Sequence, residues 1–131
     1  MVRSRISAAI AAAFSVVAVG SANASIVITE VYAAGSGNLT YAADWFELTN
    51  TGAAAVDITG WKIDDSSAAF ATAVAFRGIT SIGAGQSVVF FEGNTAGSND
   101  ATITTNFINA WFGGTAPVGF QIGAYGGSGV G

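Results

Sequence analysis

The side chains that could do chemistry in this sequence are carboxylates, because the chain contains no histidine and no cysteine. Asp44 and Glu47 flank a tryptophan–phenylalanine pair, and Asp64 and Asp65 form a second oxygen-rich cluster. Calcium binds carboxylate oxygens, and a calcium site needs several of them to converge. We therefore name these four residues as calcium candidates. The alternative for the first pair is a solvent-facing strand position, and for the second a turn in which aspartate caps its own backbone.

Two glutamates could in principle form a catalytic pair, because Glu30 and Glu47 have the residue types of a glycosidase acid and base. By the two-residue period of a strand, Glu30 shares a face with Ile26 and Ile28, so burial of that face would leave its carboxylate in need of partners. No other pattern supports catalysis, and the lack of histidine removes the commonest general base. We predict no catalytic residue, a non-enzymatic protein and no cofactor, with calcium as the one ion considered.

The three tryptophans are candidates for either binding or core packing. Trp45 and Trp111 lie beside predicted loops, where an exposed indole could stack on a sugar ring or pack on a protein partner. The alternative for both is core packing or cover of an open sheet edge. Trp61 follows Gly60 within a predicted strand, and we expect it in the core.

The charge balance disfavours nucleic acid as a partner. The chain has 8 acidic and 4 basic residues, which gives a net charge of −4 at pH 7. Two of the basic residues, Arg3 and Arg5, lie in a segment that we expect to be removed. The remaining acidic surface repels phosphate backbones. The glycine-containing turns at 35–37 and 83–85 also lack the lysine that a phosphate-binding loop requires.

Residues 1–24 have the features of a helical secretory signal peptide. Arg3 and Arg5 supply the positive region, residues 8–19 form an apolar run, and residues 22–24 read Ala-Asn-Ala, a small-residue cleavage site. The run is shorter than the roughly 20 residues that cross a bilayer as a helix, so we expect no membrane span in the mature chain. We predict cleavage before Ser25 and export from a bacterium-like cell to its surface or the outside, with the periplasm as the alternative.

The rest of the chain, residues 25–131, has the pattern of a single all-β domain. Short β-branched and aromatic runs recur about every 10 residues with turn signals between them, as in a β-sandwich. We predict loops at 34–43 and 93–101, extended structure at 68–76, and a short strand or helical turn at 107–112. Strands are predicted at 25–33, 44–49, 55–58, 61–64, 79–82 and 86–92.

Four sequence blocks then resemble the lamin tail domain. They occur in the family's order and read I-V-I-T-E-V at 26–31, W-F-E-L-T-N at 45–50, V-D-I-T-G-W-K-I at 56–63 and I-G-A-G-Q-S-V-V-F-F at 82–91. The resemblance implies an immunoglobulin-like β-sandwich and a module that is not itself catalytic. Similar domains continue with another strand pair after the glycine-rich segment, whereas we predict no closing strand beyond Gly113. We therefore expect an incomplete sandwich, a fragment of a longer protein, against the alternative of a natural flexible end.

Three functional hypotheses remain open. The first is a non-catalytic structural or interaction module of an exported bacterial protein, which binds protein or carbohydrate at the cell surface or outside it. The second is an accessory domain of a larger secreted hydrolase whose catalytic part lies elsewhere. The third is a calcium-stabilised adhesion domain. If the last strands are missing, the apolar run 88–91 should also make the chain prone to aggregate.

Overall fold

The computed structural model describes residues 25–33, 41, 43–65 and 67–127. The predicted signal peptide and the glycine turn at 35–37 lie outside this part of the chain. Within the described ranges there are eight strands and one helix, in the order β1 (Ile26–Tyr32), β2 (Trp45–Asn50), β3 (Val56–Asp57), β4 (Lys62–Ile63), β5 (Val74–Arg77), β6 (Ser81–Ile82), β7 (Ser87–Gly93), α1 (Asp100–Phe112) and β8 (Ile122–Gly126).

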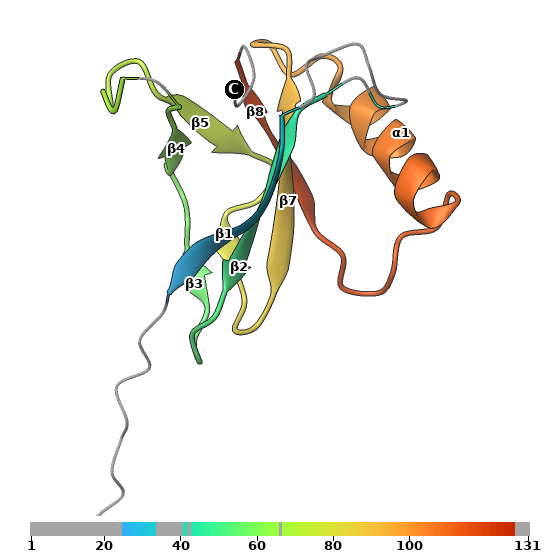
Figure 1. The fold of residues 1–131 in the computed structure, drawn as a ribbon, viewed down its shortest axis with the longest axis horizontal. Helices are drawn as coiled ribbons and strands as arrows, with labels where there is room; N and C mark the ends of the chain where they lie inside the picture. Colours follow the sequence, from blue (N-terminus) through green and yellow to red (C-terminus); the bar gives the residue numbers. More distant parts are fainter. Residues whose placement is uncertain (1–24, 34–40, 42, 66, 128–131) are drawn as a thin grey trace, which may run out of the picture.

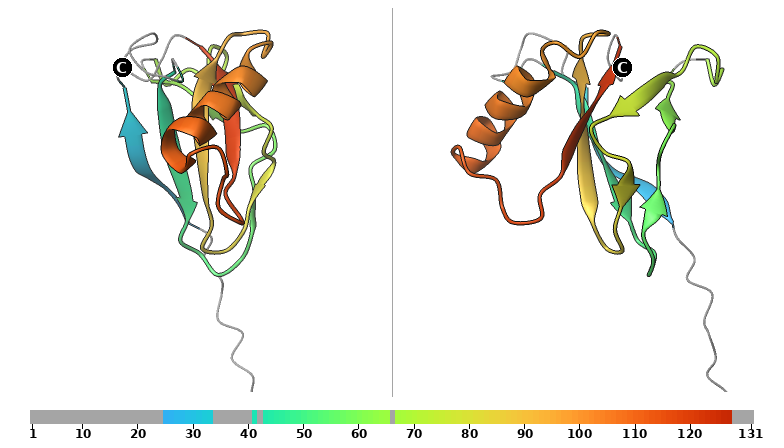
Figure 2. Two further views of the ribbon diagram at one scale, coloured as in Figure 1. Left: turned by 90° about the vertical axis from the view of Figure 1, so that its right-hand side faces the viewer. Right: turned by 180° about the vertical axis from the view of Figure 1, so that it is seen from behind.

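Six of these strands form one curled sheet in the order β1-β2-β7-β8-β5-β4, and β3 pairs with β6 in a separate ribbon. Neighbouring strands of the curled sheet are antiparallel except β7 and β8, which are parallel. The sheet bends so that β4 and β5, together with β3, lie across from β1, β2 and β7 (Figure 1). The helix covers the opposite face of the β2–β7–β8 region, as the two turned views show (Figure 2).

Strand β7 is apolar on both faces because it lies inside the sheet with a layer on each side. Val88 and Phe90 point into the curl, whereas Val89 and Phe91 point toward the helix, and all four are buried. A strand buried on both faces has a continuous apolar run rather than an alternating one. The two neighbours of β7 are β2 and β8, so the expectation that this run lacks its partners is wrong.

The curled sheet separates two hydrophobic cores. The helix-side core lies between α1 and the sheet and comprises Tyr41, Ala43, Trp45, Val89, Phe91, Ile103, Phe107 and Ala124. The inner core lies inside the curl and comprises Phe46, Leu48, Ile58, Ile82, Val88, Phe90 and Tyr125. Burial of apolar surface contributes roughly 25 cal/mol per Å², so the helix-side core holds α1 against the sheet and the inner core stabilises the curl of the sheet.

Helix α1 is longer than the sequence predicted. The pattern indicated a loop at 93–101 and a short strand or helical turn at 107–112, whereas the helix spans Asp100–Phe112. Ile103 and Phe107, four residues apart, are its buried positions, and Gly113 ends it in the left-handed conformation with φ of 65°. The amide of Gly113 donates to Asn109 and that of Gly114 to Ile108, which satisfies two terminal carbonyls. Within the described residues, no helix is long and apolar enough to cross a membrane.

Strand β8 shows that the expectation of no strand beyond Gly113 is wrong. Its sequence, IGAYG, reads as a flexible segment, but its glycines have a packing role. A Cβ at Gly123 would lie 2.7 Å from the carbonyl oxygen of Arg77 and 2.7 Å from the ring of Phe90. Glycine therefore lets β8 fit closely beside β5 and over the inner core.

The placement of Trp61 also differs from the sequence prediction. Its side chain is 40% exposed rather than buried in the core. The preceding residue, Gly60, has φ of 75°, and this left-handed turn changes the direction of the chain just before β4. The indole lines a smaller groove of about 280 Å³ between the outer strands β1 and β4.

Candidate functional site

A groove of about 570 Å³ lies between α1, the segment that follows it, and the face of the sheet that points toward the helix. This size falls within the range of roughly 300–1,000 Å³ that is usual for small-ligand sites. We call it the aromatic groove. Its lining residues are Glu30, Trp45, Glu47, Gly85, Gln86, Ser87, Val89, Phe107, Trp111, Phe112, Pro117, Val118, Gly119 and Phe120.

One wall of the groove is a chain of aromatic rings. The Trp45 and Trp111 rings meet edge to face, with centroids 5.8 Å apart, and Phe107 lies 5.7 Å from Trp45 and 5.9 Å from Trp111. Phe120 continues the wall at 6.3 Å from Phe107. Contacts of this geometry are worth about 0.5–1.5 kcal/mol each beyond the burial of area, so the rings hold one another in place.

The two tryptophans have different parts in this wall. Trp45 is only 3% exposed, and its indole N–H donates to the Tyr41 hydroxyl at 3.1 Å. Trp111 is 51% exposed and lies four residues after Phe107, so both point to the sheet side of α1. Trp45 is therefore a buried anchor, and Trp111 is the indole that a ligand can reach.

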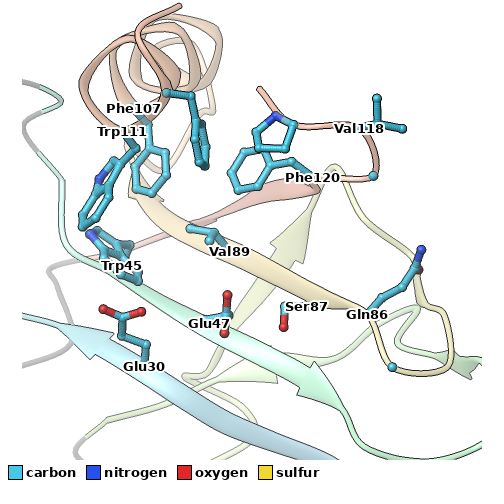
Figure 3. A pocket seen from close by; sticks show the side chains of 14 residues that line it. Glu30, Trp45, Glu47, Gln86, Ser87, Val89, Phe107, Trp111, Val118 and Phe120 are labelled. Atoms are coloured by element: carbon cyan, nitrogen blue, oxygen red, sulfur yellow. The ribbon is translucent and has the colours of Figure 1, made fainter. Parts of the chain in front are cut away.

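The facing side of the groove is polar and comes from the strands (Figure 3). Thr29 donates to Glu47 Oε1 at 2.6 Å and shares a 2.9 Å hydrogen bond with Thr49. Thr49 in turn shares a 2.7 Å hydrogen bond with Ser87. This row of hydroxyls fixes the Glu47 carboxylate on the floor of the groove. The Glu30 carboxylate, by contrast, makes no hydrogen bond with any residue that the structure describes.

Glu30 reaches the groove because β1 carries a bulge. Ile28 pairs with Leu48, but Glu30 pairs with Glu47, so Thr29 is an extra residue in the ladder. Cross-strand partners share a face, and a bulge changes the phase of the alternation. The prediction that Glu30 shares a face with Ile28 is therefore wrong.

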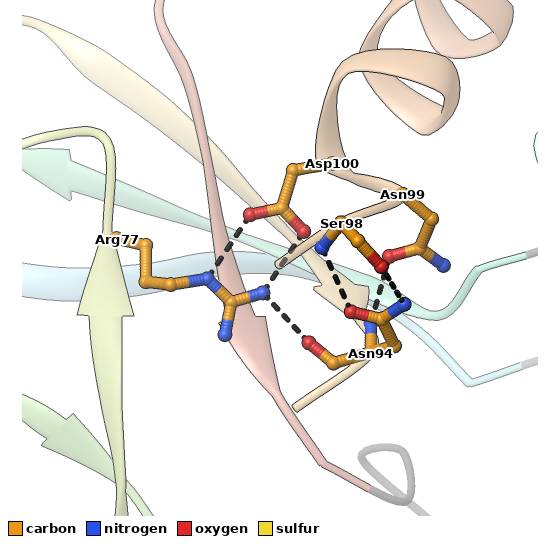
Figure 4. Close-up of polar contacts among 5 residues, drawn as sticks. All are labelled: Arg77, Asn94, Ser98, Asn99 and Asp100. Atoms are coloured by element: carbon orange, nitrogen blue, oxygen red, sulfur yellow. Dashed lines mark hydrogen bonds and ion pairs between the residues drawn. The ribbon is translucent and has the colours of Figure 1, made fainter. Parts of the chain in front are cut away.

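A clamp of polar contacts fixes the start of α1 against the sheet (Figure 4). Arg77 of β5 binds Asp100 through both carboxylate oxygens, at 3.0 Å and 2.9 Å, and donates to the Asn94 carbonyl at 3.1 Å. Asn94 also bonds with Ser98 and Asn99 in the loop before the helix. A bidentate arginine–carboxylate pair fixes direction as well as distance. The clamp thus orients the helix that carries Phe107 and Trp111.

The family of the chain follows from its sequence and agrees with this architecture. The profile of the Lamin Tail Domain family matches residues 20–121. The chain belongs to the lamin tail domain family. Comparisons with curated proteins and with solved structures find no match. The lamin tail domain is an immunoglobulin-like, non-catalytic interaction domain, and the predicted family and all-β fold class are both confirmed.

In this lamin tail domain the four calcium candidates lie in different surroundings. Among the described residues, no three acidic side chains come close enough to hold a metal ion. Asp64 accepts from the amides of Ser67 and Ala69 and from the Ser67 hydroxyl, which is the pattern of a turn cap. Asp65 is exposed in the same turn.

Asp44 does not lie in the groove with Glu47, although only three positions of sequence separate the two residues. Asp44 is buried, and its carbonyl accepts from the amide of Glu92 at 2.8 Å. Burial raises the pKa of Glu92, and the charge of Asp44 raises it further. Burial also raises the pKa of Tyr125, helped by Glu92, Asp44 and Asp65. Since Tyr125 belongs to the inner core, these groups lie on the other side of the sheet from the aromatic groove.

Sequence reasoning named three residues that this lamin tail domain brings together in one groove, Trp45, Glu47 and Trp111. It considered Glu30 and Glu47 only as a catalytic pair without other support and assigned Glu30 to the wrong face, because a bulge leaves no clear mark in a β-branched run. It also missed Phe107 and Phe120. The signal for Phe107 was present, since Ile103, Phe107 and Trp111 recur every four residues before a glycine pair, as on one face of a helix.

Proposed function

We propose that this lamin tail domain is a non-catalytic carbohydrate-binding module of an exported bacterial protein, acting at the cell surface or outside it. The observation that supports this function is the aromatic groove, which sets an exposed indole opposite a row of carboxylate and hydroxyl groups. A sugar ring has an apolar C–H face and a polar edge. Binding it calls for an aromatic surface with a few polar groups placed beside it.

The groove also suits binding better than hydrolysis. A glycosidase acid lies in apolar surroundings that keep it protonated, whereas Glu30 is exposed at the edge of the sheet. Glu47 is held by Thr29, which donates a hydrogen bond to its carboxylate. Both carboxylates are thus arranged to accept hydrogen bonds from a bound ligand.

The test compares two tryptophans by titration calorimetry against cello- and chito-oligosaccharides. Replacing the groove indole, Trp111→Ala, should lower affinity by about tenfold, the equivalent of about 1.4 kcal/mol. Trp61→Ala is the matched control, because Trp61 is 40% exposed but lies outside the aromatic groove. Its affinity should be unchanged, and the oligosaccharides should be recovered intact. The proposal would be contradicted if no oligosaccharide bound, or if Trp111→Ala and Trp61→Ala lost affinity equally.

Export rests on residues 1–24 and has its own test. The positive, apolar and small-residue regions of that segment are those of a secretory signal. Expression of the full chain in a bacterial host should yield exported protein whose first residue is Ser25. Retention in the cytoplasm with an intact N-terminus would contradict it. Fractionation of the host would separate the surface and the medium from the periplasm.

A second candidate function is protein binding along β1, and the exposure of this outer strand favours it. Ile28 and Val31 are 63% and 53% exposed, and an apolar outer strand can add a strand from another chain. Self-association that an Ile28→Lys variant abolishes would support this function. A carbohydrate-binding or protein-binding module would equally suit an accessory domain of a larger secreted hydrolase.

A further inference from the structure

We propose that the aromatic groove selects saccharides that carry a positively charged amine, such as oligomers of glucosamine, over neutral and anionic ones. This inference rests on the proposed carbohydrate function and specifies its ligand class. The feature that carries it is the combination of two carboxylates and several aromatic rings in one groove, with no basic residue among the lining side chains.

The charge of the groove is uncompensated. Among the described residues that line it, the ionisable side chains are Glu30 and Glu47. The two basic residues in the described part of the chain are both engaged elsewhere: Lys62 lies 4.3 Å from the centre of the Phe70 ring, and Arg77 is paired with Asp100. A cationic ligand is therefore attracted to the groove, and an anionic one is repelled.

The carboxylates also retain capacity to accept hydrogen bonds. The Glu30 carboxylate has no hydrogen-bond partner among the residues that the structure describes. The hydrogen bonds to the Glu47 carboxylate within the same set of residues are accepted by Oε1, which leaves Oε2 for a ligand. Each carboxylate can accept about four hydrogen bonds. An ammonium group, which donates three hydrogen bonds, fits between two such groups better than a hydroxyl does.

The aromatic wall supplies the remaining attraction. Trp111, at 51% exposure, offers its ring to a ligand in the groove that the two glutamates line. A cation held near an aromatic face is stabilised by the negative face of the ring, and tryptophan is the most effective residue. The same ring packs on the apolar face of a sugar. A glucosamine unit has both features, an apolar face for Trp111 and an ammonium for the glutamates.

The experiment uses two oligosaccharides with the same backbone. Titration calorimetry of the full chain is done with a glucosamine hexamer and with its fully N-acetylated, neutral counterpart, in mildly acidic buffer that keeps the amines protonated. The glucosamine hexamer should bind at least tenfold more tightly, and rising salt should narrow the difference because salt screens exposed charges. Glu30→Gln and Glu47→Gln should each reduce the preference severalfold, and Trp111→Ala should weaken both ligands.

The control for charge is Asp65→Asn, which removes one exposed carboxylate outside the groove and should leave the preference intact. Equal affinity for both hexamers, with both weakened by Trp111→Ala, would overturn the inference while the proposed function stands. Binding of neither hexamer would overturn the inference, and failure of the cello-oligosaccharides to bind as well would overturn the proposed function. The inference would also be overturned if Asp65→Asn reduced the preference for the glucosamine hexamer as much as Glu30→Gln does, or if a lysine hexapeptide bound as tightly as the glucosamine hexamer. Either result would mean that net charge rather than the groove selects the ligand.

Discussion

Glu30 and Glu47 are direct cross-strand partners in the β1–β2 ladder, and both line the aromatic groove. Two carboxylates in this relation repel each other, and like charges directly opposite destabilise a sheet. The bulge at Thr29 creates the pairing, because without it Glu30 would lie on the other face. The domain therefore carries an unfavourable charge pair at the place where a ligand is proposed to bind.

The first prediction follows from this pair. Glu30→Gln keeps the shape of the side chain and removes one charge, so the free energy of unfolding should rise by up to about 1 kcal/mol. Urea unfolding at low salt measures the change, and added salt should reduce it. A decrease in stability would mean that Glu30 has a favourable contact in the native state.

The second prediction concerns Asn50, a buried polar residue with no exposed surface. Its amide donates to the carbonyls of Ala54 and Ile82, at 2.7 Å and 2.9 Å, and its side-chain oxygen accepts from Gly52. Asn50→Ala would leave these groups without partners, so stability should fall by about 2–3 kcal/mol. Asn109→Ala on the exposed helix surface is the control and should change stability by less than about 0.5 kcal/mol.

The third prediction concerns the clamp at the start of α1. Arg77 and Asp100 are each partly exposed, at 29% and 26% of the side chain, so their pair should contribute only about 1 kcal/mol to global stability. Its local effect should be larger. Asp100→Asn should speed amide hydrogen exchange in the first turns of α1 and weaken ligand binding at Trp111. If exchange in the helix is unchanged, packing in the helix-side core is sufficient to position it.

The fourth prediction concerns pH. Burial, and then the charge of Asp44, raise the pKa of Glu92 above its ordinary value. The folded protein therefore binds this proton more tightly than the unfolded chain, and stability falls as pH rises from the ordinary glutamate value through the raised one. Glu92→Gln should remove that loss, so its stability advantage over the wild type should appear with rising pH and vanish in acid.

Asp57 provides a control of opposite sign. Hydrogen bonds from the Thr59 side chain, and then from its backbone, lower the pKa of Asp57. The ionised Asp57 therefore contributes to folding stability at pH values above the ordinary aspartate pKa, and this contribution is lost as pH falls through the lowered pKa. Asp57→Asn should therefore match the wild type in acid and be the less stable of the two at neutral pH. Identical pH profiles for the Glu92 and Asp57 variants would contradict both assignments.

The fifth prediction separates the adhesion hypothesis from the others. Because no three acidic groups converge in the described residues, millimolar calcium should leave the melting temperature unchanged. Differential scanning calorimetry with calcium and with a chelator makes the comparison. A rise in melting temperature that Glu47→Gln or Asp64→Asn abolishes would contradict this expectation and support a calcium site at the candidates named from the sequence.

The sequence predicted the strands whose side chains alternate or form long apolar runs. Both β2 and β7 begin and end within one residue of the expected bounds. The position of β8 was not predictable from its own residues, because a glycine-rich strand has no apolar pattern. Its place depends on the space left by Phe90 and by the backbone at Arg77. Local pattern could not indicate a long-range packing constraint of this kind.

The candidate site was predictable in its residue types and not in its geometry. Exposed indoles and carboxylates near Trp45 and Trp111 pointed to a binding surface. The exposure of the two tryptophans, 3% and 51%, depends on where α1 lies over the sheet. Trp61 was misplaced for a similar reason, since a left-handed glycine before it turns the indole outward. In each case the tertiary arrangement, rather than the local sequence, decides the role.

Strand β8 comes after every other described element in the chain but occupies an interior position in the sheet, between β7 and β5. The chain is synthesised from its N-terminus, so β1, β2 and β7 can pair early, whereas β4 and β5 cannot join them until residues 122–126 emerge. The pairings that close the sheet span long stretches of sequence, which slows folding. Until β8 arrives, one side of the apolar strand β7 stays unpaired and open to other chains. Assembly of this domain is therefore a late event in its production, and it depends on the most glycine-rich of its strands.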